Sequence, residues 1–184
     1  GFTTALNVLE GQRRPGHFNG VLNVIKILFE LVEPSKAYFG EKDYQQLWLI
    51  QQLVKALKIP INVLGCSTIR TVQGLALSSR NQRLTEQEKK IAVILFKSVN
   101  NLKKEIKFNI KHNNTLKKSD LVSIQERIRN KISQHTNIKL DYFEVIDVEN
   151  FSFAKEIKID KKYRILIAAH VSKIRLIDNI LIDW

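Results

Sequence analysis

The sequence has no methionine and only one cysteine among its 184 residues. Cys66 has no second cysteine with which to form an internal disulfide, and no other ligand stands near it at metal-binding spacing. We therefore expect a buried, reduced thiol and no metal site built by the protein. Because methionine is absent and the first residue is glycine, we also expect the chain to be a piece of a longer protein.

Long apolar runs are missing as well. The longest lie within "RILIAA" and "VIKILF", which are too short to span a bilayer, and no charged-then-apolar leader opens the chain. We expect a soluble, cytoplasmic protein with no membrane partner. A composition of 44% hydrophobic and 26% charged residues excludes a disordered chain, and the length allows one or two domains.

Negative charge is scarce, since the formal net charge is +12. The basic excess is spread over the chain, with ten basic and five acidic residues in 1–83 and 20 basic and 13 acidic residues in 84–184. A nucleic-acid surface favours aromatic side chains among the cations, but the lysine-rich segments 103–118 and 155–164 contain only Phe108 and Tyr163. A basic nucleic-acid-binding protein is therefore the weaker alternative, and a small anionic substrate explains a local cluster equally well.

The first 83 residues predict a βαβ unit. Val21, Val24, Ile25, Leu28 and Leu31 repeat at helical spacing and predict an apolar helix face within 18–32. The stretch "AYFG" predicts a strand, "EKDYQQLWLIQQLVKAL" a helix and "INVLG" a second strand. Strand, helix and strand in this order indicate a parallel sheet, whose ligands bind beyond the carboxyl ends of the strands.

Residues 84–184 predict a separate α+β domain. Thr85 and Glu88 have the spacing of a capping box ahead of a long amphipathic helix. We expect the polar segment "KFNIKHNNTLKK" to be a loop, followed by a helix that uses Leu121, Ile124 and Ile128. Three runs with β character, "LDYFEVIDV", "YRILIAAHV" and "IRLIDNILI", close the chain and predict an antiparallel sheet.

Three loops carry groups that suit phosphate. "RRPGH" places Arg14 and His17 before a helix N-terminus, where a cation and unpaired N–H groups favour an anion. "GEKD" follows the first strand: Gly40 permits a tight turn there, and Lys42 supplies a cation. "GLALSSRN" offers two hydroxyls and Arg80. Taken alone, each loop is more typical of a capped helix or a solvated loop than of a site, and Asp43 is placed either to cap the helix or to bind sugar hydroxyls. Their combination within 72 residues indicates a site.

The segments "LEGxxRPGHFxGV", "FGEKDxQQLxLI" and "GLALSSRN", in this order and at these separations, resemble the pantothenate synthetase (pantoate–β-alanine ligase) family, and "RLIDN" at 175–179 resembles its terminal strand. The resemblance covers nearly the whole chain. It implies the C-terminal half of a Rossmann-like nucleotidylyltransferase domain in 1–83, followed by a small α+β lid domain in 84–184.

The resemblance also implies an activity: ATP and pantoate form pantoyl adenylate with release of pyrophosphate and with Mg²⁺, and β-alanine then displaces AMP. The full-length protein would be a homodimer. The implied site residues are Gly40, Lys42, Asp43 and backbone near Ile69 for ATP, Ser78, Ser79 and Arg80 as the phosphate clamp, Arg14 and His17 in the same pocket, Gln46 for pantoate and Glu10 for β-alanine.

Two departures from the family pattern stand out. Gln73 occupies a position where many members have an acidic residue. Nothing in the chain corresponds to the family's first hundred or so residues with their "HxGH" motif, so we expect this chain alone to be inactive. The alternatives are another adenylate-forming enzyme of the nucleotidylyltransferase superfamily, which should lack the "RPGHF" and "GEKDxQQ" pair, and the nucleic-acid binder.

Overall fold

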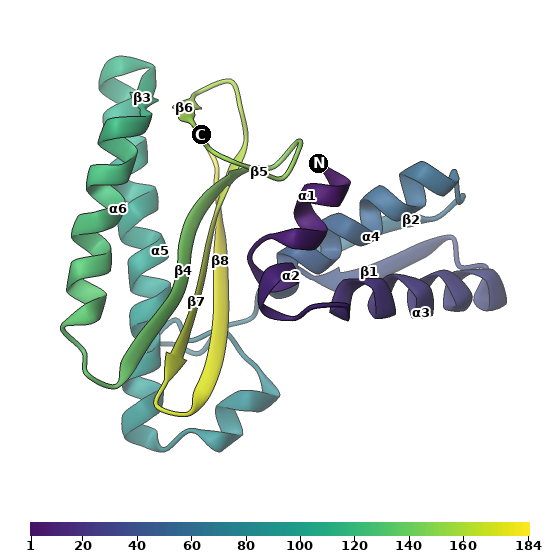
Figure 1. The fold of residues 1–184 in the computed structure, drawn as a ribbon, viewed down its shortest axis with the longest axis horizontal. Coiled ribbons are helices and arrows are strands. Elements are labelled where there is room, and N and C mark those ends of the chain that lie inside the picture. The colour runs from purple at the N-terminus through teal and green to yellow at the C-terminus, as the bar shows by residue number, and fades with distance from the viewer. The chain divides into compact units, whose positions relative to one another are not determined.

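The computed structural model describes residues 1–184, and its internal contacts divide them into Gly1–Thr68 and Ile69–Trp184 (Figure 1). The segment 69–83, which the sequence groups with the first domain, falls in the second of these units. The domain boundary predicted at Arg83 for the complete protein stays a prediction. Among the helices, none has an apolar stretch of the length that a bilayer crossing requires.

The first unit is the predicted βαβ arrangement with helices ahead of it. Its elements are α1 (Phe2–Asn7), α2 (Glu10–Arg13), α3 (His17–Val32), β1 (Lys36–Gly40), the 3-10 helix η1 (Glu41–Asp43), α4 (Tyr44–Leu57) and β2 (Asn62–Cys66). Strands β1 and β2 pair in parallel, with Lys36 opposite Asn62 and Gly40 opposite Cys66. Helix α4 is the crossover between the strands, and α1 and α3 both pack against it.

The structure corrects the face that α3 buries. Val24, Leu28 and Leu31 of the predicted apolar face are 57%, 46% and 77% exposed, whereas Phe18, Leu22 and Phe29 are buried. These three also lie at helical spacing, and ten of the 16 residues of α3 are apolar, so apolar side chains stand on more than one side of the helix. Periodicity alone therefore could not decide which side faces the core, because adjacent residues differ by about 100° around a helix.

A long helix and an antiparallel sheet form the second unit. Its elements are η2 (Ser79–Arg83), α5 (Glu86–Asn113), β3 (Thr115–Lys117), α6 (Lys118–Ser133), β4 (Ile138–Asp147), β5 (Ser152–Phe153), β6 (Glu156–Lys158), β7 (Tyr163–Val171) and β8 (Ile174–Ile182). The four-stranded sheet has the order β5-β4-β7-β8, and β3 pairs with β6. Helices α5 and α6 cover one face of this sheet (Figure 1).

Helix α5 confirms one prediction and corrects another. The capping box is present, since the Thr85 hydroxyl accepts a hydrogen bond from Glu88 N and the Glu88 carboxylate accepts one from Thr85 N. The loop predicted for 107–118 is wrong, because α5 continues to Asn113 and β3 follows. Buried Ile106 and Ile110 extend the apolar face of α5 by two turns, and Asn114 ends the helix with φ 56°.

Candidate active site

The carboxyl ends of β1 and β2 lie side by side, because Gly40 pairs with Cys66. This edge is where parallel sheets bind ligands. Gly40 has φ −66° and ψ 129°, a conformation open to any residue, so the turn that follows in η1 does not depend on the backbone freedom of glycine. A Cβ atom on Gly40 would meet nothing within 4 Å, which leaves the space in front of this strand end open. Cys66 is exposed rather than buried, because it is the last residue of β2.

Lys42 and Asp43 follow β1 in the 3-10 helix η1. Asp43 stands at the N-cap of α4 but makes no capping hydrogen bond with its side chain, so the capping role considered for it is not observed. Its carboxylate is exposed instead. Gln46, half-buried, follows three positions later. Residues three apart share a helix face, so Asp43 and Gln46 are placed to approach one ligand.

The N-terminus of α3 carries a second group of candidate residues, Arg14 and His17. Gly16 has φ 77°, a conformation that favours glycine, and delivers the chain into α3 at His17. The first turn of α3 contains no acidic residue and no capping side chain. Its N–H groups therefore retain the partial positive charge that attracts anions. A cavity of about 430 Å³ beside it is lined in part by Arg14, Gln12 and Asn19.

The pKa of His17 is lowered from its ordinary value of 6.5. Burial of the ring contributes most, the nearby Arg14 cation adds to the effect, and Glu10 and Asp43 oppose it. The imidazole is therefore neutral near pH 7 and offers one donor and one acceptor. Glu10 comes from α2, Arg14 from the loop before α3 and Asp43 from η1, and all three are close enough for their charges to act on His17 at the start of α3.

Gln45 is a positioning residue that the sequence analysis did not single out. Its side chain is buried, and its amide nitrogen donates to Ala5 O at 2.6 Å and Val8 O at 2.9 Å. Its amide oxygen accepts from Glu10 N at 3.1 Å. Gln45 thus fixes the segment between α1 and α2 to α4. The signal in the sequence was the doubled glutamine after "GEKD", of which only Gln46 was assigned a role.

The clamp candidates Ser78, Ser79 and Arg80 form the start of η2 in the second unit. The Ser78 hydroxyl accepts a hydrogen bond from Arg80 N at 3.2 Å, so its own hydrogen remains available to a ligand. Ser79 and Arg80 are exposed, and Arg80 makes no ion pair. Buried Asn81 donates to Ala76 O at 2.9 Å and holds the turn together.

The predicted site residues thus fall into two groups. Glu10, Arg14, His17, Gly40, Lys42, Asp43 and Gln46 belong to the first unit, and Ile69, Ser78, Ser79 and Arg80 to the second. Within the first unit Glu10, Arg14 and Asp43 lie close enough to His17 for their charges to act on its imidazole. Ile69 has an exposed side chain, and its carbonyl accepts from Leu77 N at 2.9 Å.

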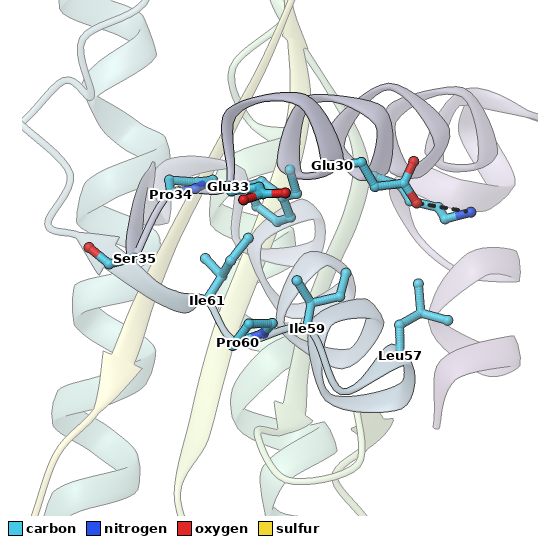
Figure 2. Close-up of a pocket in the computed structure, with 10 residues that line it drawn as sticks. Glu30, Glu33, Pro34, Ser35, Leu57, Ile59, Pro60 and Ile61 are labelled. Carbon is cyan, nitrogen blue, oxygen red and sulfur yellow. Dashed lines mark ion pairs between the residues drawn. The ribbon is translucent and has the colours of Figure 1, made fainter.

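A larger groove of about 760 Å³ lies elsewhere in the first unit (Figure 2). Its lining includes Phe29, Leu57 and Ile61 and the ion pair between Lys26 and Glu30. Ser35 and Ile61 directly precede β1 and β2, so the groove lies at the amino ends of the strands. No predicted site residue lines it. Its size alone therefore does not mark it as the active site.

Comparison with known proteins decides the family. The model of the family "Pantoate-beta-alanine ligase" matches residues 2–181. The chain belongs to this family. The match favours the pantoate–β-alanine ligases over other adenylate-forming families, and it confirms the fold class and the resemblance noted in the sequence.

Members of the pantoate–β-alanine ligase family resemble the chain over almost its full length. Pantothenate synthetase of Cytophaga hutchinsonii is 39% identical over 175 residues, covering 95% of this chain and 59% of that protein. The enzyme of Aquifex aeolicus is 43% identical over 173 residues, covering 94% and 57% respectively. The chain therefore spans less than two thirds of the length of these relatives.

Solved structures of pantoate–β-alanine ligases also match the fold. Pantothenate synthetase from Thermus thermophilus superposes with a TM-score of 0.82 at 32% identity, over 96% of this chain and 60% of that chain. The enzyme from Francisella tularensis, described as complexed with beta-gamma ATP and beta-alanine, matches with a TM-score of 0.68 at 36% identity, over 97% and 55%.

Proposed function

We propose that the complete gene product joins pantoate to β-alanine at the expense of ATP. The carboxylate of pantoate attacks the α-phosphorus of ATP, pyrophosphate leaves, and the resulting pantoyl adenylate reacts with the amine of β-alanine to release AMP and pantothenate. The observation that carries this proposal is the family match over residues 2–181. The complex of the Francisella tularensis enzyme with an ATP species and β-alanine supports it.

The first unit supplies the binding surface for the adenylation step in this scheme. A carboxylate and a polyphosphate repel each other, so cations must neutralise them and hold the line of attack. Lys42 contacts the ATP phosphates, while Gly40 and Asp43 contact the ribose, and the open space in front of Gly40 suits that approach. Gln46 binds pantoate from the same face of α4 as Asp43.

Arg14 and His17 complete the anionic pocket. The lowered pKa of His17 keeps the imidazole neutral, so it acts as a hydrogen-bonding group and leaves the positive charge to Arg14 and the N-terminus of α3. Glu10 is assigned to the amine of β-alanine. Glu10 is buried, and its carboxylate opposes the effect of Arg14 on the pKa of His17, which supports a place close to these two residues.

Ser78, Ser79 and Arg80 bind the phosphates during adenylation, and backbone near Ile69 contacts the adenine. Arg80 is exposed and without an ion pair, so it can neutralise the charge that develops on the departing pyrophosphate. Magnesium enters as the ion carried by the ATP phosphates. The chain gathers no three His, Cys, Asp or Glu side chains that could hold a metal, and phosphate-bound Mg²⁺ commonly keeps several waters.

The complete gene product is further proposed to act in the cytoplasm as a homodimer without a nucleic-acid partner. The exposed apolar residues of α3, which include Ile27, Leu28 and Leu31, support a contact between this helix and a further protein segment.

The test is exchange of labelled pyrophosphate into ATP that depends on pantoate and needs no β-alanine. It is run on the complete gene product and on the 184-residue chain, with omission of pantoate as the control. We expect exchange by the complete product and none by the chain alone. If both are folded and neither exchanges, the proposed adenylation is wrong.

A further inference from the structure

Arg70 anchors the segment 69–83 through an ion pair. Its guanidinium donates two hydrogen bonds to the carboxylate of Asp178, at 2.6 and 2.8 Å. It also donates to Gly74 O at 3.1 Å and Asn179 O at 3.3 Å. Asp178 is 4% exposed and lies on β8, within the "RLIDN" stretch that stood out in the sequence. A forked pair of this kind fixes both distance and orientation.

The aromatic ring of Phe96 completes the Arg70 contact. The guanidinium carbon lies 4.2 Å from the ring centroid, so the cation is held between α5 and β8. Gly74 is pressed against the same ring: a Cβ atom on it would come within 2.2 Å of Phe96, and its φ of 102° favours glycine. Arg70 and Gly74 thus hold the loop against α5, and Arg70 also binds it to β8.

Backbone hydrogen bonds connect the anchored Arg70 to Ser78. Residues Arg70 and Ala76 form an antiparallel bridge, Thr71 N donates to Leu75 O at 2.9 Å, and Leu77 N donates to Ile69 O at 2.9 Å. Ser78 follows this hairpin directly and caps η2. Any shift of the hairpin on β8 therefore displaces the hydroxyls and the Arg80 guanidinium that follow it.

We propose that Arg70 and Asp178 are positioning residues that hold Ser78, Ser79 and Arg80 at the geometry required for adenylation. This inference rests on the proposed function, which makes those three residues the phosphate clamp. Arg70 lies two positions after Thr68, the last residue of the first unit. The ion pair therefore fixes the phosphate clamp to β8 within the second unit. The pair touches no substrate and acts through the hairpin.

The test compares two variants of the complete gene product, Asp178→Asn and Glu144→Gln. Asparagine keeps the shape of Asp178 but replaces one acceptor oxygen by a donor, so it breaks the fork. Glu144 is the control, because it accepts from Arg129 of α6 at 2.8 Å in a half-buried ion pair on β4 of the same sheet, away from the hairpin. Two reactions are measured: pantoate-dependent pyrophosphate exchange, and release of AMP from supplied pantoyl adenylate by β-alanine.

We expect Asp178→Asn to lower the exchange rate by about 10- to 100-fold, because small misplacements of reacting groups have effects of that size. The Asp178→Asn variant should release AMP from pantoyl adenylate at the rate of the unchanged protein, and Glu144→Gln should alter neither reaction. An equal loss in both reactions would show a general structural role, and unchanged exchange would show no role; either result overturns the proposal. If Asp178→Asn does not fold, Arg70→Lys, which retains the charge but loses the fork, takes its place with the same criteria.

Amide hydrogen exchange gives a readout that does not depend on activity. Breaking the fork should speed exchange at the amides of Thr71 and Leu77, whereas Glu144→Gln should not. If the unchanged protein shows no pyrophosphate exchange, the proposed function fails and the positioning role with it, while the amides still report whether the ion pair anchors the hairpin. Unaltered amide exchange in Asp178→Asn would show that the hairpin is held without Asp178 and would overturn the proposal.

Discussion

At the scale of single residues, the side chains at the carboxyl end of β1 differ in what holds them. Gln45 is buried and satisfied by three backbone groups, so it positions other elements. Asp43 is exposed and makes no capping bond, although its position at a helix start favours one. Its carboxylate is therefore not needed by α4 and can serve a ligand. Because its side chain is exposed and not used by the helix, Asp43 is the candidate for the binding surface, and buried Gln45 is not.

Lys42→Ala in the complete gene product should lower pantoate-dependent pyrophosphate exchange by about 10- to 100-fold, since a charge-assisted hydrogen bond contributes about 1.5–3 kcal/mol. The fold should be retained, as followed by circular dichroism. Lys36→Ala is the control, because Lys36 is an exposed lysine at the start of β1, and Lys42 follows the other end of that strand. A Lys42→Ala protein that exchanges at the normal rate would remove Lys42 from the phosphate site.

Arg14→Gln should raise the pKa of His17, because the Arg14 cation disfavours a second positive charge nearby. The measurement is a titration of the imidazole by nuclear magnetic resonance. Arg13→Gln is the control, since Arg13 is not among the groups that shift this pKa. If Arg14→Gln left the titration unchanged, the two side chains would not share a pocket.

The same pKa predicts the direction of a pH effect on stability. With the pKa of His17 lowered in the folded state, the unfolded chain binds more protons as the pH falls through about 6.5. Stability should therefore fall on acidification through this range, and His17→Gln should reduce that loss. Urea unfolding at about pH 8 and about pH 5.5, on either side of the ordinary histidine pKa, measures it. An equal pH dependence in both proteins would contradict the assigned cause.

At the scale of elements, the sequence predicted the strands and the crossover helix well, since their signals are local. The strand "AYFG", the helix after "GEKD" and the capping box at Thr85 all depend on neighbouring residues, and each is present. The buried face of α3 and the end of α5 were predicted wrongly. Both depend on partners distant in sequence, since Ile106 and Ile110 extend α5 only because they belong to the core of the second unit.

Gly74→Ala tests the seating of the loop on Phe96. The new methyl group would collide with the ring, and the positive φ would add strain, so we expect a loss of about 2 kcal/mol or more in the free energy of unfolding. Gly20→Ala is the matched control: it lies inside α3 with nothing within 4 Å of its Cβ position, and alanine there should stabilise by about 0.5–1 kcal/mol. Urea unfolding of both variants measures the change in the free energy of unfolding, which should have opposite signs. Equal changes would contradict the close contact between Gly74 and Phe96.

At the scale of the whole molecule, the candidate site residues were predicted from three short motifs, and their individual roles stay predictions. Their placement was not predicted, because Arg14 and Asp43 both come near His17 through tertiary contacts, among them the hydrogen bonds that join Gln45 of α4 to Ala5, Val8 and Glu10. The Arg70 and Asp178 pair joins residues 108 positions apart, and no local pattern could reveal it. Motifs thus predicted the candidate site, and tertiary contacts supplied the candidate positioning residues.

The net charge of +12 supplies the last test. A protein whose cations serve a small anionic substrate should bind oligonucleotides only through its general field, which salt screens over about 8 Å at physiological ionic strength. We expect a fluorescent single-stranded oligonucleotide to bind the complete gene product weakly at low salt and not measurably at about 0.15 M. Tight binding that persists at that salt, and that competes with ATP, would instead favour the nucleic-acid alternative, because it would require the basic side chains to act together on a polyanion.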